Sequence, residues 1–181
     1  MKLNRRFKER FTKRLHNYPG RAIGFRCDQI RTATGHLTTR EYLTHPGAVG
    51  VLAFDHTGKI ILVKQYRYPI DEFTFEIPAG KLGKRENPWL CVRRELEEET
   101  GYRAGKVSKL VSYWPTAAFS TEIIHLFVAK DLKLSQAHPD EDEFIELVKV
   151  TPKQLERWMK SGKIKDSKTL IAYNAWKVLF K

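Results

Sequence analysis

The chain has 181 residues, of which 41% are hydrophobic and 12% aromatic, enough for the core of one domain of ordinary size. No stretch approaches the roughly 20 apolar residues that a membrane-spanning helix needs, and no continuous apolar run follows the early basic residues as it does in a secretory signal. The two cysteines, Cys27 and Cys91, have no metal-ligand spacing and are interpreted as reduced thiols of a cytoplasmic protein.

The net charge of +12 lies at the two ends of the chain. Residues 1–15 carry seven Lys or Arg against one Glu, and residues 149–181 carry nine against two acids. The middle of the chain is therefore close to neutral, and its acids are clustered. Clustered carboxylates in a neutral body favour a metal site over a nucleic-acid groove.

The first 45 residues are predicted to form a basic helix followed by a β-hairpin. Apolar residues recur at every fourth position near the start: Leu3, Phe7, Phe11 and Leu15. This spacing predicts an apolar stripe along a helix, which we interpret as docking on the body or on a partner subunit rather than on a membrane. Residues 22–43 have a strand-like pattern, with a turn at Thr34-Gly35 that joins two runs as a hairpin.

Residues 46–181 are predicted to form one α/β domain, in which helices are set among the strands of a mixed sheet. The expected strands are 48–54, 59–65, 73–77, 107–113, 123–130 and 144–150. The expected helices are 87–101, one that opens at the capping box Thr151-Pro152-Lys153-Gln154 and runs to about Ser161, and a last one capped by Ser167. Helix 87–101 is the clearest, because Asn87 suits its cap, Pro88 its first turn and Gly101 the left-handed residue after its end.

Three glutamates of helix 87–101 share one face. Glu95, Glu98 and Glu99 are spaced i, i+3 and i+4, so they repel one another by a few tenths of a kcal/mol per pair on an exposed helix. A hard divalent cation such as Mg²⁺ removes this conflict, because it takes carboxylate oxygens as ligands. A solvated acidic helix face is the alternative, and the spacing alone leaves both interpretations open.

The residues around these glutamates follow a longer pattern. From Gly80 the chain has five residues, Glu86, seven residues, and then Arg94-Glu-Leu-Glu-Glu-Glu-Thr-Gly-Tyr102. This resembles the Nudix box, Gly-x5-Glu-x7-Arg-Glu-U-x-Glu-Glu-x-Gly-U, where U is a bulky apolar residue. Every fixed position is filled, although Tyr102 replaces the usual aliphatic residue. The resemblance implies the Nudix fold, an α/β/α sandwich, and hydrolysis of a diphosphate bond with Mg²⁺, or Mn²⁺ as an alternative.

The resemblance also implies roles for individual residues. The metal ligands are Glu95, Glu98, Glu99 and the backbone carbonyl of Ala79. Arg94 and Glu98 are assigned to the catalytic group as well. Gly80, Glu86 and Gly101 are structural residues of the box, and Arg94 with Glu86 braces the loop against the helix.

The sequence on both sides of the box resembles the ADP-ribose pyrophosphatase branch of the family over residues 37–155. The resemblance rests on segments 39–43, 45–49, 65–68 and 75–80. It implies substrate-binding roles for Arg40, Glu41, Arg67, Glu76 and Leu82. Arg67 is expected to meet the diphosphate, because a guanidinium fork matches phosphate oxygens in pairs. For Arg40 and Glu41 an ordinary surface salt bridge is the alternative.

The acidic segment Asp140-Glu141-Asp142-Glu143 resembles the loop that supplies late catalytic glutamates in this branch. By register, Glu141 is expected to be the general base and Glu143 an additional metal ligand. A charged surface turn is the alternative for both residues.

One segment departs from the pattern of ADP-ribose hydrolases. These enzymes carry proline and glycine where this chain has Ala117 and Ala118. Because proline fixes φ and glycine frees it, we expect a different backbone path here. Other nucleoside diphosphate sugars, such as ADP-glucose or GDP-mannose, are therefore also candidate substrates.

The basic ends and the intact box bear on two other functions. An RNA 5′-end pyrophosphohydrolase or RNA-binding Nudix protein would use the basic ends and bind with a steep salt dependence. A catalytically silent Nudix domain would be expected to lack a box glutamate, and none is missing.

The N-terminal hairpin resembles the extension through which ADP-ribose pyrophosphatases dimerise, so we expect a homodimer in which each pocket is partly built by the neighbouring subunit.

Overall fold

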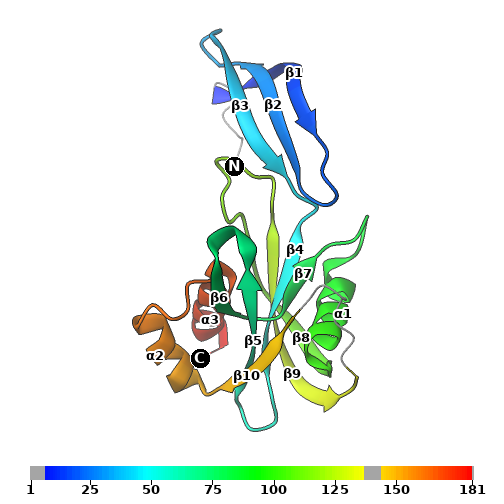
Figure 1. The fold of residues 1–181 in the computed structure, drawn as a ribbon, viewed down its shortest axis with the longest axis vertical. Coiled ribbons are helices and arrows are strands. Elements are labelled where there is room, and N and C mark those ends of the chain that lie inside the picture. The colour runs from blue at the N-terminus through cyan, green and yellow to red at the C-terminus, as the bar shows by residue number, and fades with distance from the viewer. Residues whose placement is uncertain (1–6, 137–143, 181) are drawn as a thin grey trace. The chain divides into compact units, whose positions relative to one another are not determined.

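The computed structural model describes residues 7–136 and 144–180, and the contacts divide the chain into two compact units (Figure 1). The first unit contains the residues up to Pro46 together with Trp114–Ile123. The second unit contains Gly47–Tyr113 and the chain from Ile124 onward. The N-terminal unit thus includes a later segment that the sequence analysis places in the other domain.

The described residues form mostly β-strands, together with three α-helices. The strands are β1 Arg10–Tyr18, β2 Gly24–Arg31, β3 Leu37–Thr44, β4 Ala48–Phe54, β5 Ile60–Arg67, β6 Glu72–Glu76, β7 Ala79–Lys81, β8 Tyr102–Tyr113, β9 Ile124–Leu134 and β10 Glu146–Val150. The helices are α1 Pro88–Thr100, α2 Pro152–Lys160 and α3 Ser167–Phe180. A single 3-10 turn, Tyr68–Ile70, connects β5 to β6.

The first unit is a three-stranded antiparallel sheet in the order β1-β2-β3. The predicted hairpin is confirmed as β2 and β3, with Gly35 in the left-handed conformation at φ 89° in the turn. The predicted N-terminal helix is wrong within the described residues, because Arg10–Tyr18 is strand β1. A spacing of four is an even number, so it places residues on one face of a strand as well as of a helix. Pairing with β2 decided between the two.

A carboxylate links the three strands of this sheet. Asp28 on β2 accepts hydrogen bonds from Arg14 on β1, at 2.7 and 3.1 Å, and from the hydroxyl of Tyr42 on β3, at 2.8 Å. The bond from Arg14 is the main reason that the pKa of Asp28 is lowered. The buried Asp28 is therefore charged and paired, and it ties β1 to a hairpin that would otherwise stand alone.

The second unit is built on a seven-stranded mixed sheet. Five strands follow the order β10-β5-β4-β9-β8, while β6 pairs with β5 and β7 with β4. Strands β4 and β9 are parallel, and the other neighbours are antiparallel. Helix α1 lies on one face of the sheet, and α2 and α3 lie on the other (Figure 1). The predicted α/β/α sandwich with a mixed sheet is confirmed.

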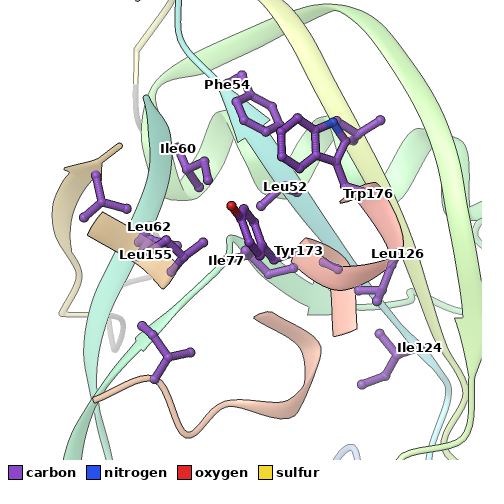
Figure 2. Close-up of a cluster of buried hydrophobic side chains, with 14 residues drawn as sticks. Leu52, Phe54, Ile60, Leu62, Ile77, Ile124, Leu126, Leu155, Tyr173 and Trp176 are labelled. Atoms are coloured by element: carbon purple, nitrogen blue, oxygen red, sulfur yellow. The ribbon is translucent and has the colours of Figure 1, made fainter. Parts of the chain in front are cut away.

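Alternating side chains of the central strands fill two cores. On β4, Leu52 and Phe54 face the core beneath α2 and α3, and Val51 and Ala53 face the core beneath α1. Both faces are covered, which explains why β4 reads as a continuous apolar run. Figure 2 shows the first core, where Trp176 of α3 packs on Phe54 with ring centroids 4.7 Å apart.

The helix caps agree with the sequence except at α3. Asn87 accepts a hydrogen bond from the backbone N–H of Trp89, and Thr151 accepts one from Gln154. The expected cap Ser167 is instead the first residue of α3, and the cap is Asp166, whose carboxylate accepts from the N–H and the hydroxyl of Thr169 at 2.9 and 2.5 Å. Asp and Ser are about equally good caps, so the sequence did not distinguish the two neighbours.

None of the helices in the described residues has the length and apolar character needed to cross a lipid bilayer.

The core beneath α2 generates a prediction about stability. Leu155 of α2 is fully buried there, whereas Leu134 at the end of β9 is 81% exposed. Leu155→Ala removes buried methyl groups and leaves a cavity, so we expect a loss of about 2–5 kcal/mol in the free energy of unfolding. Leu134→Ala is the matched control, with an expected change within about 0.5 kcal/mol. Urea unfolding followed by tryptophan fluorescence measures both; equal effects would contradict the assignment of this core.

Candidate functional site

Helix α1 presents its carboxylates because its other face is buried. Cys91, Val92 and Leu96 pack into the core against the sheet, which fixes the rotation of the helix about its axis. Gly101 ends the helix in the left-handed conformation at φ 68°. The three glutamates predicted as metal ligands consequently lie on one flank of α1, and Glu99 is only 6% exposed.

Arg94 contacts two of these carboxylates. Its Nη1 lies 2.9 Å from Oε1 of Glu95 and 2.7 Å from Oε2 of Glu98. One cation therefore offsets part of the repulsion that the i, i+3 spacing creates. The hydrogen bonds that Arg94 donates to Glu86 are the main cause that raises the pKa of Arg94. Burial opposes this, but the charge of Glu95 and the bond to Glu98 add to it, so the guanidinium stays charged.

The other edge of Arg94 is held by Glu86. Nε and Nη2 donate to the two oxygens of Glu86, each at 3.0 Å, and the backbone N–H of Gly83 donates to the same carboxylate at 2.8 Å. The hydrogen bonds from Arg94 are the main cause that lowers the pKa of Glu86 to about 2. The loop before α1 is thus fixed to the helix, as the sequence resemblance implies for Glu86 and Arg94.

The backbone at Ala79 and Gly80 runs close beside the carboxylates. The N–H of Ala79 donates to Oε2 of Glu99 at 3.0 Å. A Cβ at position 80 would lie 1.9 Å from the carboxyl carbon of Glu95, so the Glu95 side chain would have to move away. Glycine at position 80 therefore allows the Glu95 carboxylate to lie against the backbone at this point.

The side chains around α1 suit a hard cation by their chemistry. Within the described residues, no three His, Cys, Asp or Glu side chains are gathered closely enough to hold a metal ion. Arg94 forms ion pairs with Glu95 and Glu98, and the N–H of Ala79 donates a hydrogen bond to Glu99. The donors are nevertheless all oxygens on one helix flank beside a glycine, which fits Mg²⁺ and leaves further positions to water or phosphate.

A second charged cluster surrounds Glu76, which is 2% exposed. Nε and Nη2 of Arg67 donate to its two oxygens at 2.7 and 2.6 Å, and the Thr74 hydroxyl donates to Oε1 at 2.5 Å. Lys168 of α3 donates to Oε2. Burial opposes the charge of Glu76, but the bonds from Arg67 and the charge of Lys168 outweigh it and lower the pKa to about 2. The structure thus brings together Arg67 and Glu76, two residues predicted to bind substrate.

The remaining predicted substrate residues are Leu82, Arg40 and Glu41. Leu82 packs at the edge of the core beneath α1, and its N–H donates to the carbonyl of Gly47. Arg40 and Glu41 belong to the first unit, on β3. Arg40 forms an ion pair with Glu9, so the surface salt bridge considered from the sequence is present.

The two predicted loop glutamates, Glu141 and Glu143, lie outside the described residues. The segment with Ala117 and Ala118 belongs to the first unit. The two alanines lie within a turn that is closed by a hydrogen bond of 3.0 Å from the N–H of Ser120 to the carbonyl of Thr116. Backbone bonds of 2.9 Å join Leu43 to Phe119 and Thr121, so this segment lies along the end of β3.

Lys168 and Asp166 were missed by the sequence analysis. They lie 92 and 90 residues beyond Glu76 in the chain, so only the fold brings them to it. A charged pair at the start of a helix is common and gives no signal of its own. The only related signal in the sequence is the predicted start of the last helix near Ser167, which lies between these two residues.

The fold, the carboxylate-bearing helix and the braced loop identify the class of protein. The chain belongs to the Nudix family and is a hydrolase: the model of the NUDIX domain matches residues 44–172, more than half of its length.

Individual relatives are also similar over most of their length. The chain is 42% identical over 168 residues to the methanol dehydrogenase activator of Bacillus methanolicus, covering 92% of this chain and 91% of the relative. It is 41% identical over 157 residues to the ADP-ribose pyrophosphatase of Bacillus subtilis, covering 86% and 85%. It is 35% identical over 134 residues to the GDP-mannose pyrophosphatase of Yersinia enterocolitica, covering 69% and 70%.

A solved structure of an ADP compounds hydrolase superposes with a TM-score of 0.80 at 17% identity, and the match covers 92% of each chain. At this identity the likeness supports the fold alone.

The depressed pKa of Glu76 generates a prediction about pH. Its pKa falls from an ordinary value of 4.5 to about 2 in the folded chain, so the stability it contributes is present above pH 4.5 and is lost as the pH falls toward 2. The difference in unfolding free energy between the wild type and Glu76→Gln should shrink by on the order of 3 kcal/mol between pH 5 and pH 2. Urea unfolding at a series of pH values measures it. A difference independent of pH would show that Glu76 is not held as a charged group.

Proposed function

We propose that this chain hydrolyses the diphosphate bridge of nucleoside diphosphate sugars, with Mg²⁺ as cofactor and Mn²⁺ as an alternative, to a nucleoside monophosphate and a sugar phosphate. The observation that carries the proposal is the oxygen-rich flank of α1, where Glu95 and Glu99 contact the backbone of Gly80 and Ala79. The names of the relatives, ADP-ribose pyrophosphatase and GDP-mannose pyrophosphatase, support this class of substrate.

The metal site is proposed on this flank. Its ligands are Glu95, Glu98, Glu99 and the carbonyl of Ala79, with Glu143 of the later loop as an addition. When bound, Mg²⁺ supplies neutralisation of the diphosphate oxygens and a lowered pKa for the attacking water. Arg94 keeps the carboxylates of Glu95 and Glu98 in place from the side.

The reaction is the attack of water on one phosphorus and the breaking of the bridging P–O bond. The proton of the water passes to a general base, for which we propose Glu141. Arg67 is proposed to contact the diphosphate, because its side chain is 44% exposed and its guanidinium is held in a fixed orientation by Glu76. Leu82, Arg40 and Glu41 are proposed as further substrate contacts.

A panel of substrates tests the proposal. With Mg²⁺ we expect hydrolysis of one or more of ADP-ribose, ADP-glucose, GDP-mannose and UDP-glucose, and no reaction with a 5′-triphosphate RNA. Glu99→Gln removes a proposed ligand and should lower the rate by about 100-fold or more. Quantification of the released nucleoside monophosphate measures each reaction.

Glu97→Gln is the matched control. Glu97 lies on the same helix, and its side chain accepts hydrogen bonds from Arg103 and Ser135. This variant should keep the activity of the wild type. Hydrolysis of the RNA alone would overturn the substrate class, and equal activity of the two variants would overturn the metal site.

We also propose that the chain is a homodimer of the cytoplasm. All nine residues of β1 are exposed, including the apolar Phe11, Leu15 and Tyr18. Exposed apolar side chains on one strand favour a partner, and a second copy of the chain is the simplest one. The cytoplasm is supported by two free cysteines, Cys27 and Cys91.

Light scattering after size-exclusion chromatography tests the dimer. The full-length chain should elute with twice the mass of one chain. Phe11→Asp places a charge among the apolar side chains of β1 and should shift the population toward the monomer, whereas Lys13→Asp on the same strand should do so less. A wild-type chain with the mass of one copy would remove the proposal.

A further inference from the structure

Lys168 is a buried cation behind the carboxylate that holds Arg67. Its side chain is 12% exposed, and its Nζ contacts Oε2 of Glu76 and lies 2.8 Å from Oδ1 of Asp166. Burial opposes its charge, but Asp166 and Glu76 outweigh burial and raise the pKa of Lys168. A buried ammonium group is costly unless it is paired, and this one is paired twice.

The four charges of this cluster balance. Arg67 and Lys168 carry two positive charges, and Glu76 and Asp166 carry two negative ones. Oε1 of Glu76 accepts from Nε of Arg67, and Oε2 accepts from both Nη2 of Arg67 and Lys168. The negative charge of Glu76 is therefore shared between two cations and does not depend on Arg67 alone.

The two cations differ in what else they can reach. Lys168 is enclosed, whereas the side chain of Arg67 is 44% exposed. Arg67 uses Nε and Nη2 for Glu76, and its Nη1 donates to no protein atom in the part of the chain that the structure describes. One edge of the guanidinium is thus open to an anionic ligand, and a phosphate oxygen fits it.

We infer that Lys168 is a positioning residue for the diphosphate: by compensating Glu76 and Asp166, it leaves the charge of Arg67 available to the substrate. This inference rests on the proposed contact between Arg67 and the diphosphate. Without Lys168, two carboxylates compete for Arg67, and the cluster changes from neutral to a net charge of −1. Both effects weaken the attraction of a negatively charged substrate.

Kinetics of Lys168→Met test the inference. Two quantities are measured: KM and kcat for the nucleotide sugar that the wild type hydrolyses best, and Kd for inorganic pyrophosphate by calorimetry. We expect KM and Kd to rise by about tenfold, while kcat stays within about twofold, because binding rather than the chemical step is affected. Lys168→Arg keeps the charge and should stay close to the wild type.

Two further variants separate this role from a structural one. Asp166→Asn combined with Lys168→Met restores one cation against one carboxylate, and asparagine still caps α3. The double variant should recover most of the pyrophosphate affinity. Lys165→Met is the matched control, because Lys165 pairs with the exposed Glu72 nearby and should leave both constants unchanged.

The outcomes distinguish the inference from the proposed function. Unchanged KM and Kd in Lys168→Met, no detectable binding of pyrophosphate by the wild type, or a double variant no better than Lys168→Met would overturn the role of Lys168. A wild type that hydrolyses no nucleotide sugar, with pyrophosphate affinity lost in Lys168→Met and recovered in the double variant, would overturn the substrate class and support the role of Lys168. If Lys168→Met does not fold, Lys168→Gln carries the same test.

Discussion

Repulsion among three carboxylates on one flank of α1 is the constraint around which the site is built. Helical spacing forces Glu95, Glu98 and Glu99 together, and the buried apolar face of the helix prevents it from rotating to separate them. Arg94 supplies the nearest compensating charge, and Glu86 holds Arg94 by two bonds. The loop before the helix is fixed as a consequence, because the same carboxylate accepts from its backbone.

The short segment from Glu76 to Gly80 connects the carboxylates of α1 to the second charged cluster, the one around Glu76. At one end Glu76 is held by Arg67 and Lys168, and the N–H of Ile77 donates to the hydroxyl of Thr169 at 2.8 Å. At the other end the N–H of Ala79 donates to Glu99. The first turn of α3 is therefore connected to the Glu99 carboxylate of α1 through a few residues of backbone, although the two helices lie on opposite faces of the sheet.

The sequence predicted those parts of the molecule that local chemistry decides. Strand β4 and helix α1 were placed to within a residue, because a short apolar run that ends at turn residues and a cap-proline-glycine pattern are strong local signals. Strand β1 was missed because a spacing of four suits two structures and long-range pairing chose between them. The cluster at Glu76 was missed in part, because the partner in α3 is distant in sequence and no local pattern marks it.

The structure also shows which groups the lysines of the basic C-terminal segment, residues 149–181, contact. Many of its lysines pair with acids from the middle of the chain or from the segment itself: Lys165 with Glu72, Lys168 with Glu76 and Asp166, and Lys177 with Glu156. Lys163 lies over the ring of Trp158 at 3.7 Å. A nucleic-acid surface needs basic side chains that are available to phosphates, whereas these four already contact carboxylates or an aromatic ring of the chain itself. A count of charge along the sequence cannot separate the two situations, and here the pairing favours a stabilised metal-enzyme fold over an RNA-binding face.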